Sequence, residues 1–310
     1  MDKLEYVLLR LLYGIFQLFP VSIVKALAHG ITFIVRVILK YRYTVILENI
    51  MQAFPGLSES EQKRLMRASY RHFIYLWIEL LITWRLDDSY FTENFESDDM
   101  AQITGIVGEG KPVILVGGHL GNFEWLGYFL SRHIPGLYAF MKRIHNPYIN
   151  EFMISNRRRM GLSLITVDRS AFKKGLAMLK SGKSLALLAD QDVGERGIFV
   201  TFLNRPAATA TGTAIYHRQT GIPVFHCAAI RKSFGKFSIY VERIPDQSPG
   251  NDKAMDIFSL TQKHTALLEQ LVKRHPEQYF WSHRRWKSRP ENEELELYKQ
   301  YSDRYRKMMV

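Results

Sequence analysis

The stretch KPVILVGGHLGNFEWL, residues 111–126, decides the fold class of this chain. KPVILVGG is a short, continuously apolar run that ends in glycines, as does a strand buried on both faces of a sheet. The residues that follow, from 121 to 132, have the apolar spacing of a helix. A buried strand that turns through glycine into a helix indicates a parallel α/β unit.

The same alternation continues along the chain. The further apolar runs predict strands, and they are LYAFMKR (137–143), LSLITVD (162–168), SLALLAD (184–190), PVFHCAAIR (223–231) and KFSIYVERI (236–244). Helical spacing covers 146–160, 170–182, 209–220 and 251–275. We therefore predict an α/β fold with a mainly parallel central sheet flanked by helices, in one catalytic domain over residues 51–310.

The segment before residue 111 is predicted to be mostly helical. Ser58 and Glu61 have the spacing of a capping box, which opens a helix. The helical pattern that follows runs to about Arg85 through an aromatic-rich stretch. Acidic residues then cluster between 87 and 99, which predicts a loop or an exposed helix.

The N-terminus is predicted to associate with a membrane. Residues 6–19 are too few to span a bilayer, whereas residues 21–39 have the length. The polar residues of this second stretch recur at helical intervals and form one basic stripe, made of Ser22, Lys25, His29, Thr32 and Arg36. Charges in lipid are costly, so the stripe favours a helix lying in the membrane interface over a single span. The alternative is a helix packed on a soluble core with its basic face in water. We assign residues 1–50 to amphipathic, membrane-associating helices.

Composition narrows the classes of partner. The chain has 310 residues, 47% of them hydrophobic, which excludes a disordered protein. Its net charge of +12 favours anionic partners such as nucleic acid, anionic lipid or an acidic carrier protein. Its one cysteine, Cys227, excludes a disulfide framework and a multi-cysteine zinc site. No cleavable secretion signal is expected, because the first apolar stretch meets Pro20 and then a second apolar stretch.

A candidate general base lies at the end of the strand that opens the fold. Active groups of open α/β sheets gather at the carboxyl ends of strands, where His119 and Glu124 lie. A carboxylate beside a histidine fixes its tautomer and prepares it to accept a proton. In one continuous helix these two residues would point about 140° apart, so they can meet only if His119 lies in the turn before the helix. The alternative is a chance spacing, since the chain has 10 histidines.

A second candidate closes the run SLALLAD. Asp190 and Asp192 could bind a metal, pair with an arginine or hold the catalytic loop, and the alternative is a solvated loop. We rank a metal site low, because no phosphate-cradling glycine loop accompanies the two carboxylates.

Basic residues also cluster at three places. Arg143 follows a predicted strand, and Arg157 to Arg159 end a predicted helix. The segment 272–289 is rich in Lys and Arg interleaved with aromatic residues. That segment would suit single-stranded nucleic acid, a phosphorylated lipid headgroup or an acidic carrier protein, and the alternative is a solvated basic face.

Taken together, several blocks resemble a known family. The blocks are HLGNFE (119–124), FMKRIHNP (140–147), RRRMG (157–161), ALLADQD (186–192) and HPEQYFWSHRRWKSRP (275–290). In this order and spacing they resemble the lipid A late acyltransferases, the lauroyl/myristoyl acyltransferase family within the lysophospholipid acyltransferase group. The resemblance covers nearly the whole chain.

The resemblance implies an activity. It implies transfer of a fatty acyl chain from acyl carrier protein to a hydroxyl of a lipid A precursor, at the cytoplasmic face of the inner membrane. No metal, organic cofactor or nucleic acid is implied. His119 would be the general base and Glu124 would orient it. The residues expected to bind substrate or stabilise the oxyanion are Arg143, Arg157, Arg159, Asp190 and Asp192. Cys227 is expected in the core.

Two other functions fit the same residues. The first is an acyltransferase for another lipid or glycolipid, with acyl coenzyme A as a possible donor. The second is a membrane-attached protein that binds anions through its basic C-terminal block without catalysis. Neither the acyl chain length nor the acylated hydroxyl can be read from these motifs.

Overall fold

A seven-stranded sheet forms the centre of the computed structural model, which describes residues 2–97, 100–245, 250–291 and 296–302. Its strand order is β1-β9-β8-β2-β5-β3-β4. Only the pair of β8 and β9 is antiparallel among these neighbours. The strands are β1 (Phe95–Glu96), β2 (Ile114–Gly117), β3 (Tyr138–Met141), β4 (Ser163–Thr166), β5 (Leu185–Leu188), β8 (Val224–Ser233) and β9 (Lys236–Ile244). The predicted fold class and the six strands read from the sequence are confirmed.

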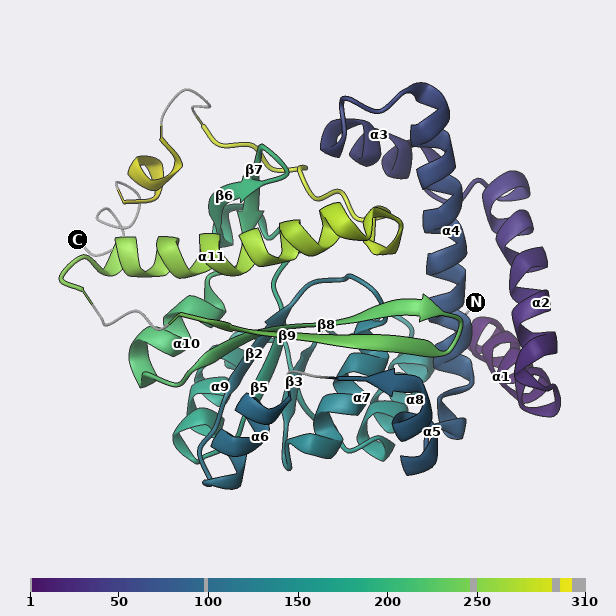
Figure 1. The fold of residues 1–310 in the computed structure, drawn as a ribbon, viewed down its shortest axis with the longest axis horizontal. Helices are drawn as coiled ribbons and strands as arrows, with labels where there is room; N and C mark the ends of the chain where they lie inside the picture. The colour runs from purple at the N-terminus through teal and green to yellow at the C-terminus, as the bar shows by residue number, and fades with distance from the viewer. Residues whose placement is uncertain (1, 98–99, 246–249, 292–295, 303–310) are drawn as a thin grey trace.

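Helices cover both faces of this sheet (Figure 1). They are α1 (Asp2–Leu18), α2 (Val21–Phe33), α3 (Tyr43–Ala53), α4 (Glu59–Leu81), α5 (Asp88–Asn94), α6 (Ala101–Gly108), α7 (Phe123–His133), α8 (Pro147–Arg159), α9 (Ala171–Lys180), α10 (Gly212–Thr220) and α11 (Lys253–Arg274). The sequence of β2 is continuously apolar because its alternate residues are buried on opposite faces of the sheet. Leu115 packs in a core with α7, whereas Ile114 and Val116 pack in a second core with α9, α10 and α11.

The predicted start of α4 is confirmed. Ser58 and Glu61 form the capping box, with both reciprocal hydrogen bonds present. The acidic stretch that follows the helix contains α5 and the short strand β1, while residues 98 and 99 lie outside the described part.

Besides β1, which lies in the stretch predicted to be a loop or an exposed helix, one pair of strands was not predicted. β6 (Ile198–Phe202) and β7 (Arg205–Thr209) form an antiparallel hairpin outside the main sheet. Its turn residues, Leu203 and Asn204, both have positive φ angles of 51° and 58°. Two-residue hairpin turns with positive φ angles favour Asn-Gly, whereas leucine is rare in that conformation. The Leu-Asn turn therefore gives no hairpin signal in the sequence.

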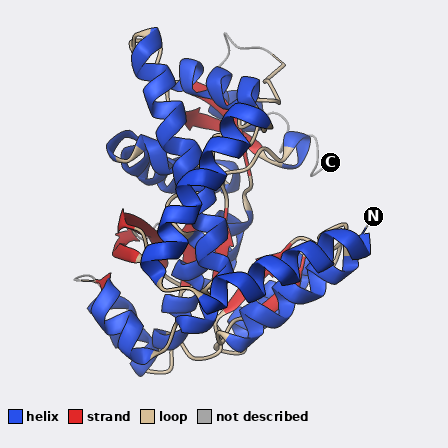
Figure 2. Cartoon of the chain, turned by 90° about the vertical axis from the view of Figure 1, so that its right-hand side faces the viewer, coloured by secondary structure: helices blue, strands red, loops and turns tan. Residues whose placement is uncertain are grey.

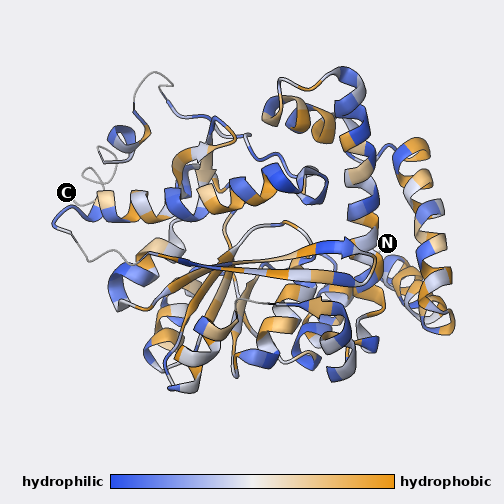
Figure 3. Ribbon diagram, viewed as in Figure 1, coloured by the Kyte–Doolittle hydropathy of each residue, from blue (hydrophilic) through white to orange (hydrophobic). Residues whose placement is uncertain are grey.

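The N-terminal helices expose apolar side chains. Within the described residues, Val21–Ile38, formed by α2 and a π-helical turn, is the one helix long and apolar enough to cross a membrane. Ile23 and Leu27 of α2 are exposed, whereas Val24 and Ala28 are buried. Figure 3 shows this apolar character over α1 and α2. Both helices lie at one side of the molecule (Figure 1), the side that faces the viewer in Figure 2, and α1 contacts α8.

The predicted domain boundary at residue 50 falls inside α3. This helix buries Ile46, Ile50 and Ala53 in the same core as the C-terminal part of α11. The division of the chain at that residue stays a prediction.

Candidate active site

The loop between β2 and α7 is held against the backbone of β8. Gly121 has a φ angle of +62°, and a Cβ added there would stand 1.9 Å from the carbonyl oxygen of Ala229. Only glycine permits this approach. Asn122 caps α7, since its side chain accepts a hydrogen bond from the N–H of Trp125. His119 therefore lies in the turn before the helix, as expected.

The carboxylate that binds the His119 ring is Asp190. Their Nδ1 and Oδ1 atoms are 2.7 Å apart, and the backbone N–H of His119 donates to Oδ2 at 2.8 Å. Burial opposes ionisation of Asp190, but the contacts with His119, together with Arg285, outweigh burial and lower its pKa to about 2. An ionised Asp190 accepts a hydrogen bond from Nδ1–H, so Nε2 is left to accept a proton from another molecule.

Glu124 is bound to Arg157 instead of His119. Its two oxygens accept hydrogen bonds from Arg157 Nε at 3.1 Å and Nη2 at 2.5 Å. The predicted contact between His119 and Glu124 is thus replaced by two separate pairs. The physical reason is that Glu124, in the first turn of α7, faces the end of α8, whereas the glycine turn directs His119 to the end of β5. Contact with Glu124 outweighs the effect of burial and raises the pKa of Arg157.

The other predicted residues lie elsewhere. Arg143 is exposed just beyond β3. Arg159 lines a separate cavity between α1 and α8. Asp192 accepts hydrogen bonds from the N–H and hydroxyl of Ser288 and from the N–H of Gly194. The structure therefore brings Asp190 and Arg157 to the neighbourhood of His119 and Glu124, but not these three.

The C-terminal block supports the His119 loop. Leu120 forms an antiparallel bridge with Tyr279, and the N–H of Phe280 donates to the carbonyl of His119 at 3.0 Å. The Phe280 ring also lies 5.8 Å from the His119 ring, measured between centroids. Two blocks far apart in the sequence thus meet at one site.

The most buried arginine of that block is internal. Arg285 donates to the carbonyl of Ala208 at 2.5 Å and to the hydroxyl of Thr209 at 2.6 Å. It is only 2% exposed. Its buried charge therefore helps to lower the pKa of Asp190, and Arg285 is not part of a solvated basic face.

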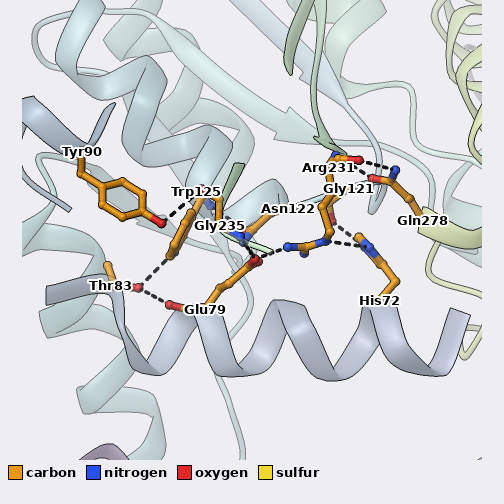
Figure 4. Close-up of polar contacts among 10 residues, drawn as sticks. All are labelled: His72, Glu79, Thr83, Tyr90, Gly121, Asn122, Trp125, Arg231, Gly235 and Gln278. Atoms are coloured by element: carbon orange, nitrogen blue, oxygen red, sulfur yellow. Dashed lines mark hydrogen bonds and ion pairs between the residues drawn. The ribbon is translucent and has the colours of Figure 1, made fainter. Parts of the chain in front are cut away.

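A buried polar network lies beneath the loop (Figure 4). Glu79 of α4, fully buried, accepts hydrogen bonds from Arg231 and from the side chain of Asn122. Arg231 Nε also donates to His72 Nδ1 at 3.2 Å, and His72 Nε2 lies 3.1 Å from the carbonyl oxygen of Gly121. Burial, followed by the charge of Arg231, lowers the pKa of His72 well below its usual value. A neutral His72 that donates from Nε2 satisfies both contacts, so α4 holds the loop through an ordered chain of hydrogen bonds.

Sequence analysis did not single out this network. His72 and Glu79 interrupt an aromatic-rich helix, and polar residues in an apolar pattern are the signal that could have revealed them. Their partner Arg231 is more than 150 residues from Glu79, and no local pattern connects the two.

An apolar cavity of about 470 Å³ opens beside His119. Its apolar lining comes from strands β2 to β5 and from α7, and it includes Leu115, Leu126, Leu130, Leu162, Leu164 and Ala186. Its polar lining includes His119, Glu124, Arg157 and Gln191. Cys227 also lines it, but burial raises the pKa of its thiol to about 12, which favours the unreactive thiol form.

Gln191 completes the polar end of this cavity. Its Nε2 lies 3.3 Å from His119 Nε2, and the His119 side chain is 17% exposed. The described residues contain no group of three or more His, Cys, Asp or Glu side chains that could hold a metal ion. The arrangement can accept a proton at one end of an apolar cavity, where amide and guanidinium donors are also present.

Comparisons with known proteins agree on one family. The family model described as bacterial lipid A biosynthesis acyltransferase matches residues 2–288. The chain is 27% identical over 274 residues to a lipid A biosynthesis lauroyltransferase of Escherichia coli (strain K12), and 24% identical over 279 residues to a palmitoleoyltransferase of the same strain. Each match covers 88% of both chains. A phosphatidylinositol mannoside acyltransferase of Mycolicibacterium smegmatis is 21% identical over 53% of this chain.

Proposed function

The chain belongs to the bacterial lipid A biosynthesis acyltransferases, and we propose that it transfers a fatty acyl chain from acyl carrier protein to a hydroxyl group of a lipid A precursor. One observation carries the mechanism. The Nε2 atom of His119, with Asp190 on the opposite ring nitrogen, lies beside an apolar cavity. A base next to an apolar cavity suits a reaction between a hydroxyl and a fatty acyl thioester.

In this mechanism His119 acts first as base and then as acid. The acceptor oxygen attacks the thioester carbonyl carbon while its proton passes to His119 Nε2. Asp190 stabilises the imidazolium through Nδ1–H. The tetrahedral intermediate then collapses, the carbon–sulfur bond breaks, and the proton on Nε2 passes to the departing sulfur. The products are an ester and the free carrier thiol, with no covalent enzyme intermediate.

The oxyanion of the tetrahedral intermediate requires hydrogen-bond donors. The backbone N–H groups of His119, Gly121 and Asn122 already donate within the protein. We assign the oxyanion first of all to the side chain of Gln191, whose amide lies beside the reacting nitrogen, and then to the backbone N–H groups at the start of α7.

Glu124 and Arg157 act as a pair in this proposal. Arg157 is largely buried and would be costly without a carboxylate partner. Glu124 occupies Nε and Nη2 of Arg157, and this fixes the guanidinium at the cavity. Arg157 then binds the polar end of a substrate, while Glu124 positions it.

The apolar cavity is the proposed site of the acyl chain. Its volume lies within the range of about 300–1,000 Å³ that is usual for ligand pockets. The exposed apolar residues of α1 and α2 support attachment to the cytoplasmic leaflet of the inner membrane, with both helices in the interface. The net charge of +12 supports attraction of an acidic carrier protein and of an anionic acceptor.

Mass spectrometry of lipid A tests the proposal. Cells that carry the protein should contain a lipid A with one more acyl group than cells without it, and His119→Ala should abolish this difference while circular dichroism stays unchanged. Purified protein should use acyl carrier protein thioesters in preference to acyl coenzyme A. Unaltered lipid A, together with acylation of another glycolipid, would favour the alternative acceptor instead.

A further inference from the structure

A further cavity, of about 590 Å³, lies between α2 and α4. We call it the arginine groove. Four arginines line it, Arg36 from the turn that continues α2 and Arg64, Arg67 and Arg71 from α4.

The groove concentrates positive charge, since its lining holds four arginines and one carboxylate. Its one carboxylate, Glu61, accepts hydrogen bonds from the N–H and hydroxyl of Ser58. Across the described residues, none of the four arginines forms an ion pair with Asp or Glu. On α4 they follow each other at intervals of three and four, where like charges repel and destabilise a helix. A bound anion would remove this repulsion.

The groove lies beside the apolar face that α2 exposes. Phe33 belongs to its lining and is 54% exposed. The next turn exposes Ile34 and Ile38, the latter to 65%. If these side chains enter the bilayer, the arginines of the groove lie at the depth of the lipid headgroups. That position favours a lipid over an acidic protein, which would have to reach below the membrane surface.

We propose that the arginine groove binds the phosphate of an anionic glycerophospholipid whose acyl chains lie along the exposed face of α2. Guanidinium groups match phosphate oxygens in geometry, and basic clusters near a membrane attract anionic headgroups. The groove is separate from the catalytic cavity, since α4 presents His72 and Phe73 to the His119 side and its arginines to α2. A lipid held there would fix the orientation of α4, and hence of the loop that carries His119, relative to the membrane.

Calorimetry on the full chain in a non-ionic detergent tests the proposal. The probes are dihexanoyl phosphatidylglycerol, dihexanoyl phosphatidylcholine and inorganic phosphate. The test variant carries Arg64→Gln, Arg67→Gln and Arg71→Gln, which keep helix-forming residues on α4. The control variant carries Lys173→Gln, Lys180→Gln and Lys253→Gln. These lysines are exposed and belong to α9 and to the first residue of α11, two elements labelled away from α2 in Figure 1, and their removal lowers the net charge by the same amount.

We expect phosphatidylglycerol to bind more tightly than the other two probes. The test variant should weaken this binding at least about tenfold, while the control variant leaves it within about twofold. Equal thermal unfolding midpoints would show that both variants fold. No turnover is measured, so the result is independent of the proposed function.

Three outcomes would overturn the proposal. The first is equal binding of phosphatidylglycerol by the test and control variants. The second is binding of inorganic phosphate as tight as that of the lipid, which would indicate a site for free anions. The third is unchanged lipid binding in the test variant together with weakened binding of acyl carrier protein, measured by calorimetry as well, which would indicate a protein-docking surface.

Discussion

At the scale of single residues, the neighbours of His119 determine which of its ring nitrogens carries the proton. Asp190, with its pKa lowered to about 2, accepts a hydrogen bond from Nδ1. Gln191 lies at Nε2 as an amide donor. These contacts select the tautomer in which Nε2 carries no proton, which is the form that a general base requires.

Asp190→Asn should lower kcat by about 10²- to 10⁴-fold. The asparagine amide can donate to Nδ1, which would move the proton to Nε2 and remove the base. Steady-state kinetics of acyl transfer measure the effect. Asp192→Asn is the matched control, because Asp192 binds Ser288 instead of His119 and should keep most of the activity. Equal losses in both variants would argue against the role of Asp190.

Gln191→Ala should lower kcat by about 10²- to 10³-fold with little change in KM, as expected for a group that acts on the oxyanion. Gln191→Glu should be no better, since a carboxylate cannot donate a hydrogen bond. Full activity of the Glu variant would exclude Gln191 as an oxyanion donor. The split between kcat and KM distinguishes this role from a loss of substrate binding.

At the scale of elements, α4 connects the loop of His119 to β8. Glu79 binds Arg231 of β8 and Asn122 at the start of α7. A buried ion pair contributes less to net stability than its geometry suggests, but removal of one partner leaves an uncompensated charge.

Glu79→Ala should lower the free energy of unfolding by about 3–5 kcal/mol, because it leaves Arg231 buried without a carboxylate. Thermal unfolding followed by circular dichroism measures the loss. Glu59→Ala, which removes an exposed ion pair with Lys63 in the same helix, should change the unfolding midpoint far less, because solvent screens this pair. A Glu79→Met and Arg231→Met double variant should be more stable than Glu79→Ala, and an equal or lower stability would contradict this account.

At the scale of the whole molecule, buried histidines couple stability to pH. Burial lowers the pKa of His226 to about 4, partly opposed by Asp190, and lowers that of His264 to about 3. The usual value is 6.5, so the unfolded chain binds these protons first. Their contribution to stability is fully present above pH 6.5 and is lost as the pH falls toward these lowered values.

His226→Gln should therefore flatten the fall in the free energy of unfolding between pH 6.5 and 4. The shift of His226 corresponds to roughly 3 kcal/mol across that window. Denaturant unfolding at several pH values gives the slope, which is the relevant quantity because the substitution also changes packing. An unchanged slope would show that His226 does not provide this dependence.

The N-terminal helices should keep the whole chain on membranes in high salt and in carbonate. Leu8→Gln, Leu11→Gln and Ile38→Gln change exposed apolar residues and leave the buried contacts of α2 intact. This variant should be released by high salt, since only electrostatic attachment remains. Release of the unmodified chain by salt alone would show that the helices do not enter the bilayer.

The sequence by itself determined six of the seven strands of the sheet and the helices between them, because apolar runs, glycines and helical spacing are local patterns that follow from backbone geometry. It also determined that His119 lies at the tip of β2. Tertiary structure alone decided the partner of His119, since β5 lies beside β2 and brings Asp190 from 71 residues away. The packing of α7 against α8 likewise decided that Glu124 pairs with Arg157. The separation of two residues along the chain does not show which strand ends are neighbours. The partners of His119 and Glu124 could therefore be identified only from the strand order and the helix packing.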